Sequence, residues 1–332
     1  MGNALRRIPT WAWLGGIVVG STVFRAILGR DLVAPFIMVD EIIWSEVARG
    51  IADTGEPLLR DEPDPGYSIV YPLLISPVYA VFDSLPEAYA GVKVVNSLLM
   101  SLAAVPAFFL ARRVVRDGLA LLAAVMTIAI PSLAYTGTVM TENAFYPLFL
   151  VVTLVLVVVL ERPSAFLVAL LYALLALAFA TRVQAVAIVA AALLAPLVLA
   201  LFDRRGLTAT MSRFRWLYGI ALGGAAGVLL LQLVSGNLLG AYSAIGDRSY
   251  DVSDGIRYLW WHVAEMSLYV LVVPLAATIV LVARGRSLDP RLLAFLAATV
   301  SLTVCIVVVV AGFASEFSLR IEERNMFYVV PL

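Results

Sequence analysis

The stretch Ser164–Phe202 reads SAFLVALLYALLALAFATRVQAVAIVAAALLAPLVLALF, with a single polar interruption, Thr181-Arg182-Val183-Gln184. A helix needs about 20 apolar residues to cross the ~30 Å hydrocarbon core of a bilayer. The stretch is about twice as long, so it predicts two membrane-spanning helices that turn at the interruption. We therefore expect a helical membrane protein.

The composition of the whole chain agrees with this interpretation. Of the 332 residues, 62% are hydrophobic and only 14% are charged, whereas soluble domains have roughly half apolar and a quarter charged residues. Lipid is therefore expected to solvate most of the surface. The single cysteine, Cys305, excludes an intrachain disulfide and a cluster of thiol ligands around a metal.

Similar apolar runs recur along the chain and predict one all-α polytopic domain, residues 1–332, with nine to ten transmembrane helices. The first run contains Arg25 and is followed by no small-residue cleavage site, which favours a retained span over a signal peptide. The sequence stops a few residues into the tenth run, so a C-terminal part is expected to be missing. The predicted spans are about 11–28, 89–111, 118–138, 145–160, 164–181, 184–202, 216–234, 264–283, 291–313 and 325 onward.

The net charge of zero conceals an asymmetry between alternate loops. Short loops rich in arginine favour the cytoplasm, which places the N-terminus there and the acidic loops on the outer face of the cell membrane. The basic side holds few acids, namely Asp117, Glu161, Asp203 and Asp289. Its arginines are Arg6, Arg7, Arg112, Arg113, Arg116, Arg162, Arg204, Arg205, Arg213, Arg215, Arg284, Arg286 and Arg291.

A long outer loop, about residues 30–88, follows the first span. Residues 40–54 carry apolar side chains at helical spacing, which predicts a helix in the membrane interface that ends at Gly55. The apolar segment 67–79 contains three tyrosines and two prolines, which indicates a re-entrant or interfacial segment. The shorter outer loops are expected at 235–263 and 314–324.

Two adjacent carboxylates, Asp40 and Glu41, begin this interfacial helix. An ionised carboxylate beside apolar surface costs several kcal/mol unless something stabilises it, so the pair is a candidate for chemistry at the membrane surface. A structural explanation is also available. Asp is favoured as a helix N-cap, and Glu in the first turn is favoured by the helix dipole.

Further polar residues are predicted on the outer side, among them Lys93, Glu142, Arg182, Gln184, Glu322, Glu323 and Arg324. A carboxylate can deprotonate a hydroxyl while Arg and Lys hold a phosphate leaving group, as glycosyl transfer from a lipid phosphate requires. The alternatives are that Arg182 reaches for headgroups and that residues 322–324 form an ordinary solvated loop. His262, the only histidine, is interpreted as a structural residue at headgroup level.

Several short motifs resemble the GT-C superfamily of glycosyltransferases that use polyprenyl-phosphate sugars, especially the protein O-mannosyltransferase and aminoarabinose-transferase group. Besides the acidic pair after the first span, the resemblance lies in Tyr71-Pro72-Leu73-Leu74, Val92-Lys93-Val94-Val95-Asn96, Thr141-Glu142-Asn143, Thr181-Arg182-Val183-Gln184 and Glu323-Arg324-Asn325-Met326-Phe327-Tyr328-Val329-Val330-Pro331-Leu332. The family often has more spans and sometimes a soluble outer domain after this point, and neither is expected within these 332 residues.

The resemblance implies an inverting transferase that moves a sugar from a polyprenyl phosphate to an acceptor on the outer face. Asp40 would be the general base and Glu41 would position substrate beside it. The donor phosphate and substrate would be bound by Lys93, Arg182, Gln184, Arg324, Glu142, Glu323, Tyr71 and Asn143. Carboxylates can also bind a divalent cation, so metal dependence stays open.

Two other functions fit parts of the same pattern. A transporter or lipid flippase would also place charge in the membrane, but these charges gather at one face and no paired broken helices are evident. A ligase or polymerase of lipid-linked glycans would use the same outer site. No nucleotide motif or nucleic-acid surface is found. The sugar and the acceptor, whether protein, lipid or glycan, are not specified by the sequence.

Overall fold

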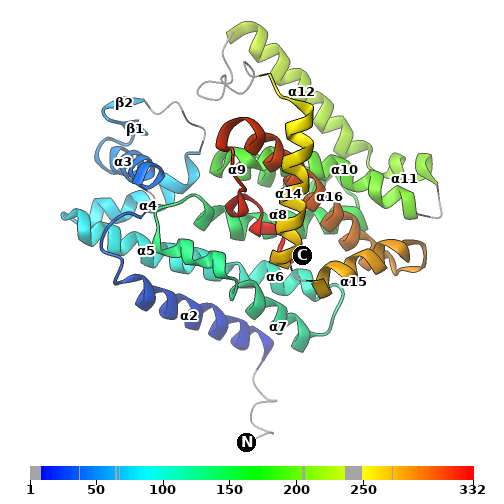
Figure 1. Ribbon diagram of the computed structural model, residues 1–332, viewed down its shortest axis with the longest axis horizontal. Coiled ribbons are helices and arrows are strands. Elements are labelled where there is room, and N and C mark those ends of the chain that lie inside the picture. The colour runs from blue at the N-terminus through cyan, green and yellow to red at the C-terminus, as the bar shows by residue number, and fades with distance from the viewer. Residues whose placement is uncertain are drawn as a thin grey trace, which may run out of the picture. The chain divides into compact units, whose positions relative to one another are not determined.

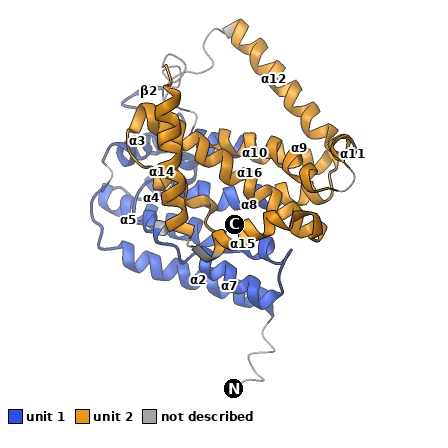
Figure 2. Cartoon of the chain, turned by 45° about the vertical axis from the view of Figure 1, so that its right-hand side comes forward, with its two compact units in different colours: residues 1–154, 176–183, 331 blue, residues 155–175, 184–330, 332 orange. Residues whose placement is uncertain are grey.

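The computed structural model describes residues 9–36, 38–63, 66, 68–203, 206–235, 249–270 and 272–332. Arg6, Arg7, Tyr67, Arg204 and Arg205, which were considered above, lie outside this set. The chain divides into two compact units (Figure 2). Unit 1 comprises residues 1–154, 176–183 and 331, and unit 2 comprises residues 155–175, 184–330 and 332.

Unit 1 is built from the N-terminal helices (Figure 1). Helix α2 packs against α5, α3 against α4, and α6 against α7. A two-stranded antiparallel sheet pairs Leu58 with Pro63 and Leu59 with Glu62. The elements are α2 (Thr10–Gly29), α3 (Met38–Thr54), β1 (Leu58–Leu59), β2 (Glu62–Pro63), α4 (Val70–Val81), α5 (Leu85–Leu102), α6 (Ala104–Ala111), α7 (Asp117–Thr127) and the 3₁₀ helix η1 (Pro131–Gly137).

Helices α8 (Glu142–Glu161) and α9 (Ala165–Thr181) contribute residues to both units. In unit 2, α10 and α14 both pack against α16. The other elements of this part of the chain are η2 (Val183–Ala185), α10 (Val186–Phe202), α11 (Leu207–Arg213), α12 (Arg215–Ser235), α14 (Val252–Val270), α15 (Val272–Ala283), η4 (Gly285–Ser287), α16 (Pro290–Phe313), the π-helical turn η5 (Ala314–Ser318), η6 (Glu323–Asn325) and η7 (Phe327–Val329).

Local sequence signals explain where several helices begin and end. Ser84 caps α5 by accepting a hydrogen bond from the backbone N–H of Glu87, and Asp289 caps α16 by accepting one from Arg291. Both helices begin with proline in the first turn, where a missing N–H costs nothing. Helix α3 ends before Gly55, whose φ of +81° suits a residue without a side chain. The predicted helix after the first span is therefore confirmed.

Six helices in the described residues are long and apolar enough to cross a membrane. A seventh is added if α14 and α15, which are bent by 109° at their junction, count as one broken span. The all-α, multi-pass class is thus supported, but nine to ten spans are not confirmed. The six are Thr10–Gly29, Leu85–Ala111, Glu142–Glu161, Val183–Phe202, Arg215–Val234 and Pro290–Ser318.

The differences from the predicted spans have local causes. The run at 118–138 is broken because α7 ends at Thr127 and Pro131 begins a 3₁₀ helix, while α9 has only 17 residues. Residues 325–332 contain 3₁₀ turns rather than the start of a tenth span, and Phe327 and Tyr328 are buried there. The predicted outer loops are shorter than expected, since α14 begins at Val252 and α16 is extended by a π turn to Ser318.

Exposed apolar side chains mark the surface that lipid is expected to cover. On α12, six of the residues between Val228 and Val234 are large apolar side chains that are more than half exposed. On α2, Val19, Phe24 and Leu28 are likewise exposed. Water would solvate such a surface poorly, so these helices fit a lipid environment.

Candidate functional site

The structure distributes the predicted site residues between the two units. Unit 1 contains Asp40, Glu41, Tyr71, Lys93, Glu142, Asn143 and Arg182, and unit 2 contains Gln184, Glu323 and Arg324. Of those in unit 1, Glu41, Tyr71 and Asn143 take part in buried hydrogen bonds that join α3, α4, α5 and the segment before α8.

The Glu41 carboxylate is fully buried and is bound by three donors of the protein itself. Its Oε1 accepts a hydrogen bond from the backbone N–H of Phe36 at 2.6 Å. Its Oε2 accepts hydrogen bonds from the Tyr89 hydroxyl and from the backbone N–H of Val139, both at 2.9 Å. Such charge-assisted hydrogen bonds offset the desolvation of a carboxylate, so Glu41 ties the beginning of α3 to α5 and to the segment that precedes α8.

Lys93 lies one helical turn after Tyr89 and is 3% exposed. Its ammonium donates hydrogen bonds to the carbonyl of Gly29 at 2.6 Å and to that of Leu32. The Gly29 carbonyl is the last of α2 and the Leu32 carbonyl lies three residues beyond it, so the ammonium sits where the helix dipole favours a cation. The ammonium also lies 5.0 Å from the centre of the Tyr89 ring. Lys93 thus fixes the end of the first span.

Two amides and one tyrosine complete the network. The Tyr71 hydroxyl on α4 donates to Asn96 Oδ1 at 3.0 Å, and Asn96 Nδ2 donates to the carbonyl of Thr138 at 2.8 Å. Asn143 donates to the same Thr138 carbonyl at 3.0 Å. Burial raises the pKa of the Tyr71 hydroxyl, which keeps it protonated as a donor. These contacts hold α4 and the segment before α8 in place.

Arg182 forms an ion pair with Glu142, with Nη1 and Oε1 2.8 Å apart. Nη1 also donates to the Thr141 hydroxyl at 2.9 Å. The Glu142 side chain is fully buried, whereas that of Arg182 is 15% exposed. The guanidinium therefore compensates a buried carboxylate and keeps a small exposed edge.

Asp40 differs from its neighbour in exposure. It is half-buried and lies in the first turn of α3, where a negative charge is favoured by the helix dipole. The helix begins at Met38, so Asp40 is inside the helix and is not the N-cap that its position suggested. The hydrogen bonds of Glu41 fix the first turn of α3, and they thereby also fix the position of the Asp40 backbone.

In unit 2 the predicted residues lie near a second buried network. Gln184 donates to the carbonyl of Asn325 at 2.7 Å, and the Asn325 side chain donates to Glu322 Oε2 at 3.1 Å. The buried His262 ring accepts a hydrogen bond from the Glu322 N–H at 3.1 Å. Glu323 is exposed and Arg324 is half-buried. His262 is therefore fully buried, and its ring binds the backbone that precedes Glu323.

Sequence reasoning did not assign roles to Tyr89, Asn96 or Asn325. A weak signal was available for two of them, because Tyr89, Lys93 and Asn96 recur at three- and four-residue spacing on a mostly apolar helix and so share one face. The backbone N–H of Val139, which binds Glu41, leaves no such signal in the sequence.

Within the described residues, no three His, Cys, Asp or Glu side chains are grouped so that they could hold a metal ion. A cavity of about 470 Å³ lies in unit 2, and none of the predicted site residues lines it. Comparison with known proteins gave no match to a family model, a curated protein or a solved structure.

Proposed function

We propose that the chain is a membrane glycosyltransferase that transfers a sugar from a polyprenyl-phosphate donor to an acceptor at the outer face of the membrane. The resemblance of its short motifs to the GT-C superfamily motivates the reaction class. The observation that carries the proposal is the contrast between two adjacent acids, one buried and fully bound, the other half-exposed on the same helical turn.

In this proposal the two acids have different tasks. Glu41 is a positioning residue, because its oxygens are occupied by Phe36, Tyr89 and Val139. Asp40 is the general base that removes the proton of the acceptor hydroxyl as the new glycosidic bond forms. A general base must be held in a fixed position and orientation toward the acceptor hydroxyl. In this proposal the hydrogen bonds of Glu41 hold α3, and therefore Asp40, in that position.

The leaving phosphate needs a cation. Within unit 1, Arg182 and Lys93 are the candidates that the motifs suggested. Lys93 is 3% exposed and donates to two carbonyls of the chain, so we assign it to holding the first span. Arg182 retains an exposed edge beside its Glu142 partner and is the proposed phosphate contact.

The test is the release of polyprenyl phosphate from membranes that contain the chain. Isotope-labelled polyprenyl-phosphate hexoses, pentoses and aminoarabinose are supplied one at a time, with and without a chelator of divalent cations. Loss of a general base lowers rates by about 10²–10⁴-fold, so we expect Asp40→Asn to reduce release by at least about 100-fold. A flippase would move the donor without releasing the phosphate.

Asp53→Asn is the matched control, because Asp53 is an exposed acid near the other end of α3. It should leave the rate unchanged. Full release by the Asp40→Asn protein, at equal amounts in the membrane, would remove Asp40 as the base. Release from a lipid-linked oligosaccharide but from no monosaccharide donor would indicate a glycan ligase or polymerase instead.

A further inference from the structure

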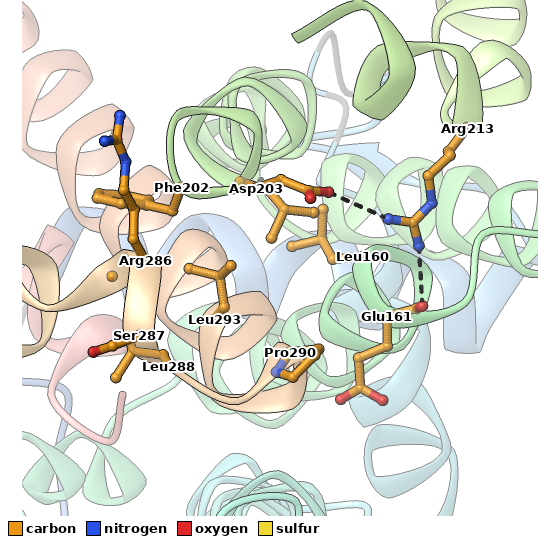
Figure 3. Close-up of a pocket in the computed structure, with 12 residues that line it drawn as sticks. Leu160, Glu161, Phe202, Asp203, Arg213, Arg286, Ser287, Leu288, Pro290 and Leu293 are labelled. Atoms are coloured by element: carbon orange, nitrogen blue, oxygen red, sulfur yellow. Dashed lines mark hydrogen bonds and ion pairs between the residues drawn. The ribbon is translucent and has the colours of Figure 1, made fainter. Parts of the chain in front are cut away.

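The cavity of about 470 Å³ in unit 2 lies where several membrane-length helices end. Its lining includes the last residues of α8 and α10 and the first residues of α16 (Figure 3). These three elements belong to stretches long and apolar enough to cross a membrane. Their ends are therefore expected at the depth of the lipid headgroups.

The lining combines apolar leucines with polar and charged side chains, including the acids Glu161 and Asp203. Leu160, Leu199 and Leu293 come from the helix ends, whereas Arg213, Arg286 and Ser287 come from the segments that connect the helices. In Figure 3, Arg213 and Arg286 lie on opposite sides of Leu160 and Leu293. An acyl or glycerol portion would contact the leucines while a phosphate lies between the cations.

The shape of the cavity is maintained by a close contact. Gly285 lies against the ring of Phe202, so close that an added Cβ would be 2.3 Å from its Cδ1 atom. Glycine at this position allows the turn 285–287 to lie directly over the end of α10. This contact holds Arg286 and Ser287 of the turn close to the apolar end of α10.

Arg213 lies at long distances from the Asp203 carboxylate and from the backbone carbonyl of Glu161. Its Nη1 is 3.8 Å from Asp203 Oδ2, and its Nη2 is 3.4 Å from the carbonyl of Glu161. Both distances exceed the ~2.7–2.9 Å of a strong charge-assisted hydrogen bond. Asp203 also accepts a hydrogen bond from Thr210 at 3.0 Å, so it keeps a donor if the guanidinium turns toward a ligand.

The side chains that line the cavity include two arginines, Arg213 and Arg286, and two acids, Glu161 and Asp203, so the lining itself is balanced in charge. In the described parts of the connecting segments around it, arginines outnumber acids. The arginines are Arg162, Arg213, Arg215, Arg284, Arg286 and Arg291, and the acids are Glu161, Asp203 and Asp289. The positive excess raises the local concentration of anionic headgroups, which each basic residue attracts by about 1 kcal/mol near a membrane surface.

We propose that this cavity binds one anionic phospholipid, with its phosphate held by Arg213 and Arg286 and its glycerol end against the leucines. The site belongs to unit 2 and does not depend on the glycosyltransferase proposal. It is a lipid site and not a free-phosphate site, because leucines from the helix ends line part of the cavity and a free phosphate would not contact them.

Native mass spectrometry of the delipidated protein in detergent tests the proposal. Phosphatidylglycerol or phosphatidylcholine is added back at matched concentration. We expect one retained phosphatidylglycerol per chain, retained at least about tenfold better than phosphatidylcholine, and a loss of that preference in Arg213→Gln/Arg286→Gln. An excess of inorganic phosphate should not displace the lipid.

Arg162→Gln is the control, because Arg162 is exposed on the same connecting segment as Glu161 but does not line the cavity. It should retain the lipid. Arg286→Gln alone, at an exposed position, guards against a folding defect and should weaken retention on its own. Equal retention by the double variant and the wild type, equal retention of the two lipids, or displacement by inorganic phosphate would each overturn the proposal.

Discussion

The charged residues of unit 1 and those around the cavity of unit 2 are held in opposite ways. Glu41, Lys93 and Glu142 are at most 3% exposed, and each contacts partners at 2.6–2.9 Å. Arg213 is 28% exposed along its side chain and lies 3.8 Å from its acidic partner. Tight, buried pairs are costly to disturb, whereas long, half-exposed contacts leave a group able to bind something else.

This difference separates two roles of a charged side chain in a membrane protein, namely stabilising the fold and binding a ligand. A buried charge with several short contacts positions the backbone around it, and its removal should lower stability. A half-exposed charge beside a cavity contributes little to stability, and its removal should lower binding. Substitutions at Glu142, Glu41, Arg213 and Asp251 can test this separation, with expected effects on stability that decrease in that order.

The largest effect is expected from removing one partner of the buried ion pair. Glu142→Ala leaves the Arg182 guanidinium without its carboxylate, which costs about 3–5 kcal/mol for a buried pair. SDS-induced unfolding followed by circular dichroism measures the loss. Arg182→Met/Glu142→Leu should recover much of it. If Glu142→Ala unfolds together with the wild type, the pair is not a structural determinant.

A smaller loss is expected at Glu41. Glu41→Gln replaces an acceptor of three hydrogen bonds by an amide that cannot accept all of them, which leaves at least one buried donor unpaired at a cost of about 1–3 kcal/mol. The same unfolding measurement applies. Glu46→Gln is the matched control, since Glu46 forms an exposed pair with Arg49 on the same helix. Equal effects of the two substitutions would contradict the positioning role of Glu41.

The cavity arginine should behave differently. Arg213→Gln is expected to change the free energy of unfolding by no more than about 1 kcal/mol, because its ion pair is partly exposed and long. Its effect should appear in lipid retention instead. A loss of stability as large as that of Glu142→Ala would show that Arg213 stabilises the fold, and it would contradict the proposed difference between the two regions.

The smallest effect is expected at an exposed cap. Asp251 Oδ1 accepts hydrogen bonds from the Ser253 hydroxyl and from the backbone N–H groups of Ser253 and Asp254, which lowers its pKa. The stabilisation is present above the ordinary carboxyl pKa and is lost as the pH falls through the lowered value. Amide exchange at the start of α14, corrected for intrinsic rates, should therefore accelerate in acid. Asp251→Ala should show fast exchange at every pH.

Much of the fold could be predicted because it follows from one-dimensional patterns. The apolar runs predicted the positions of most helices, and the residues after the first span formed the expected helix α3, which ends before Gly55. The predicted number of spans was not confirmed, because some apolar stretches do not form one long helix. Residues 118–138 contain no charged side chain, yet Pro131 and its neighbours form a 3₁₀ helix, and average hydropathy does not reveal that change.

The candidate site was predicted only as a set of residue types. The motifs identified Glu41, Lys93, Asn143 and Arg182 as unusual, but not that Glu41 binds a backbone N–H at Val139 or that Lys93 binds the end of the first span. Backbone donors carry no residue identity, so a sequence pattern cannot reveal them. The half-exposure of Asp40 likewise depends on how α3 is oriented.

The sequence by itself determined that this chain is helical and suited to lipid, because runs of about 20 apolar residues have few other stable conformations. Only the tertiary structure decided which charges are buried and which line a cavity. Adjacent residues such as Asp40 and Glu41 point about 100° apart on a helix, and their environments are set by segments remote in the chain. Partners drawn from positions 36, 89 and 139 meet at Glu41 only after the helices have packed.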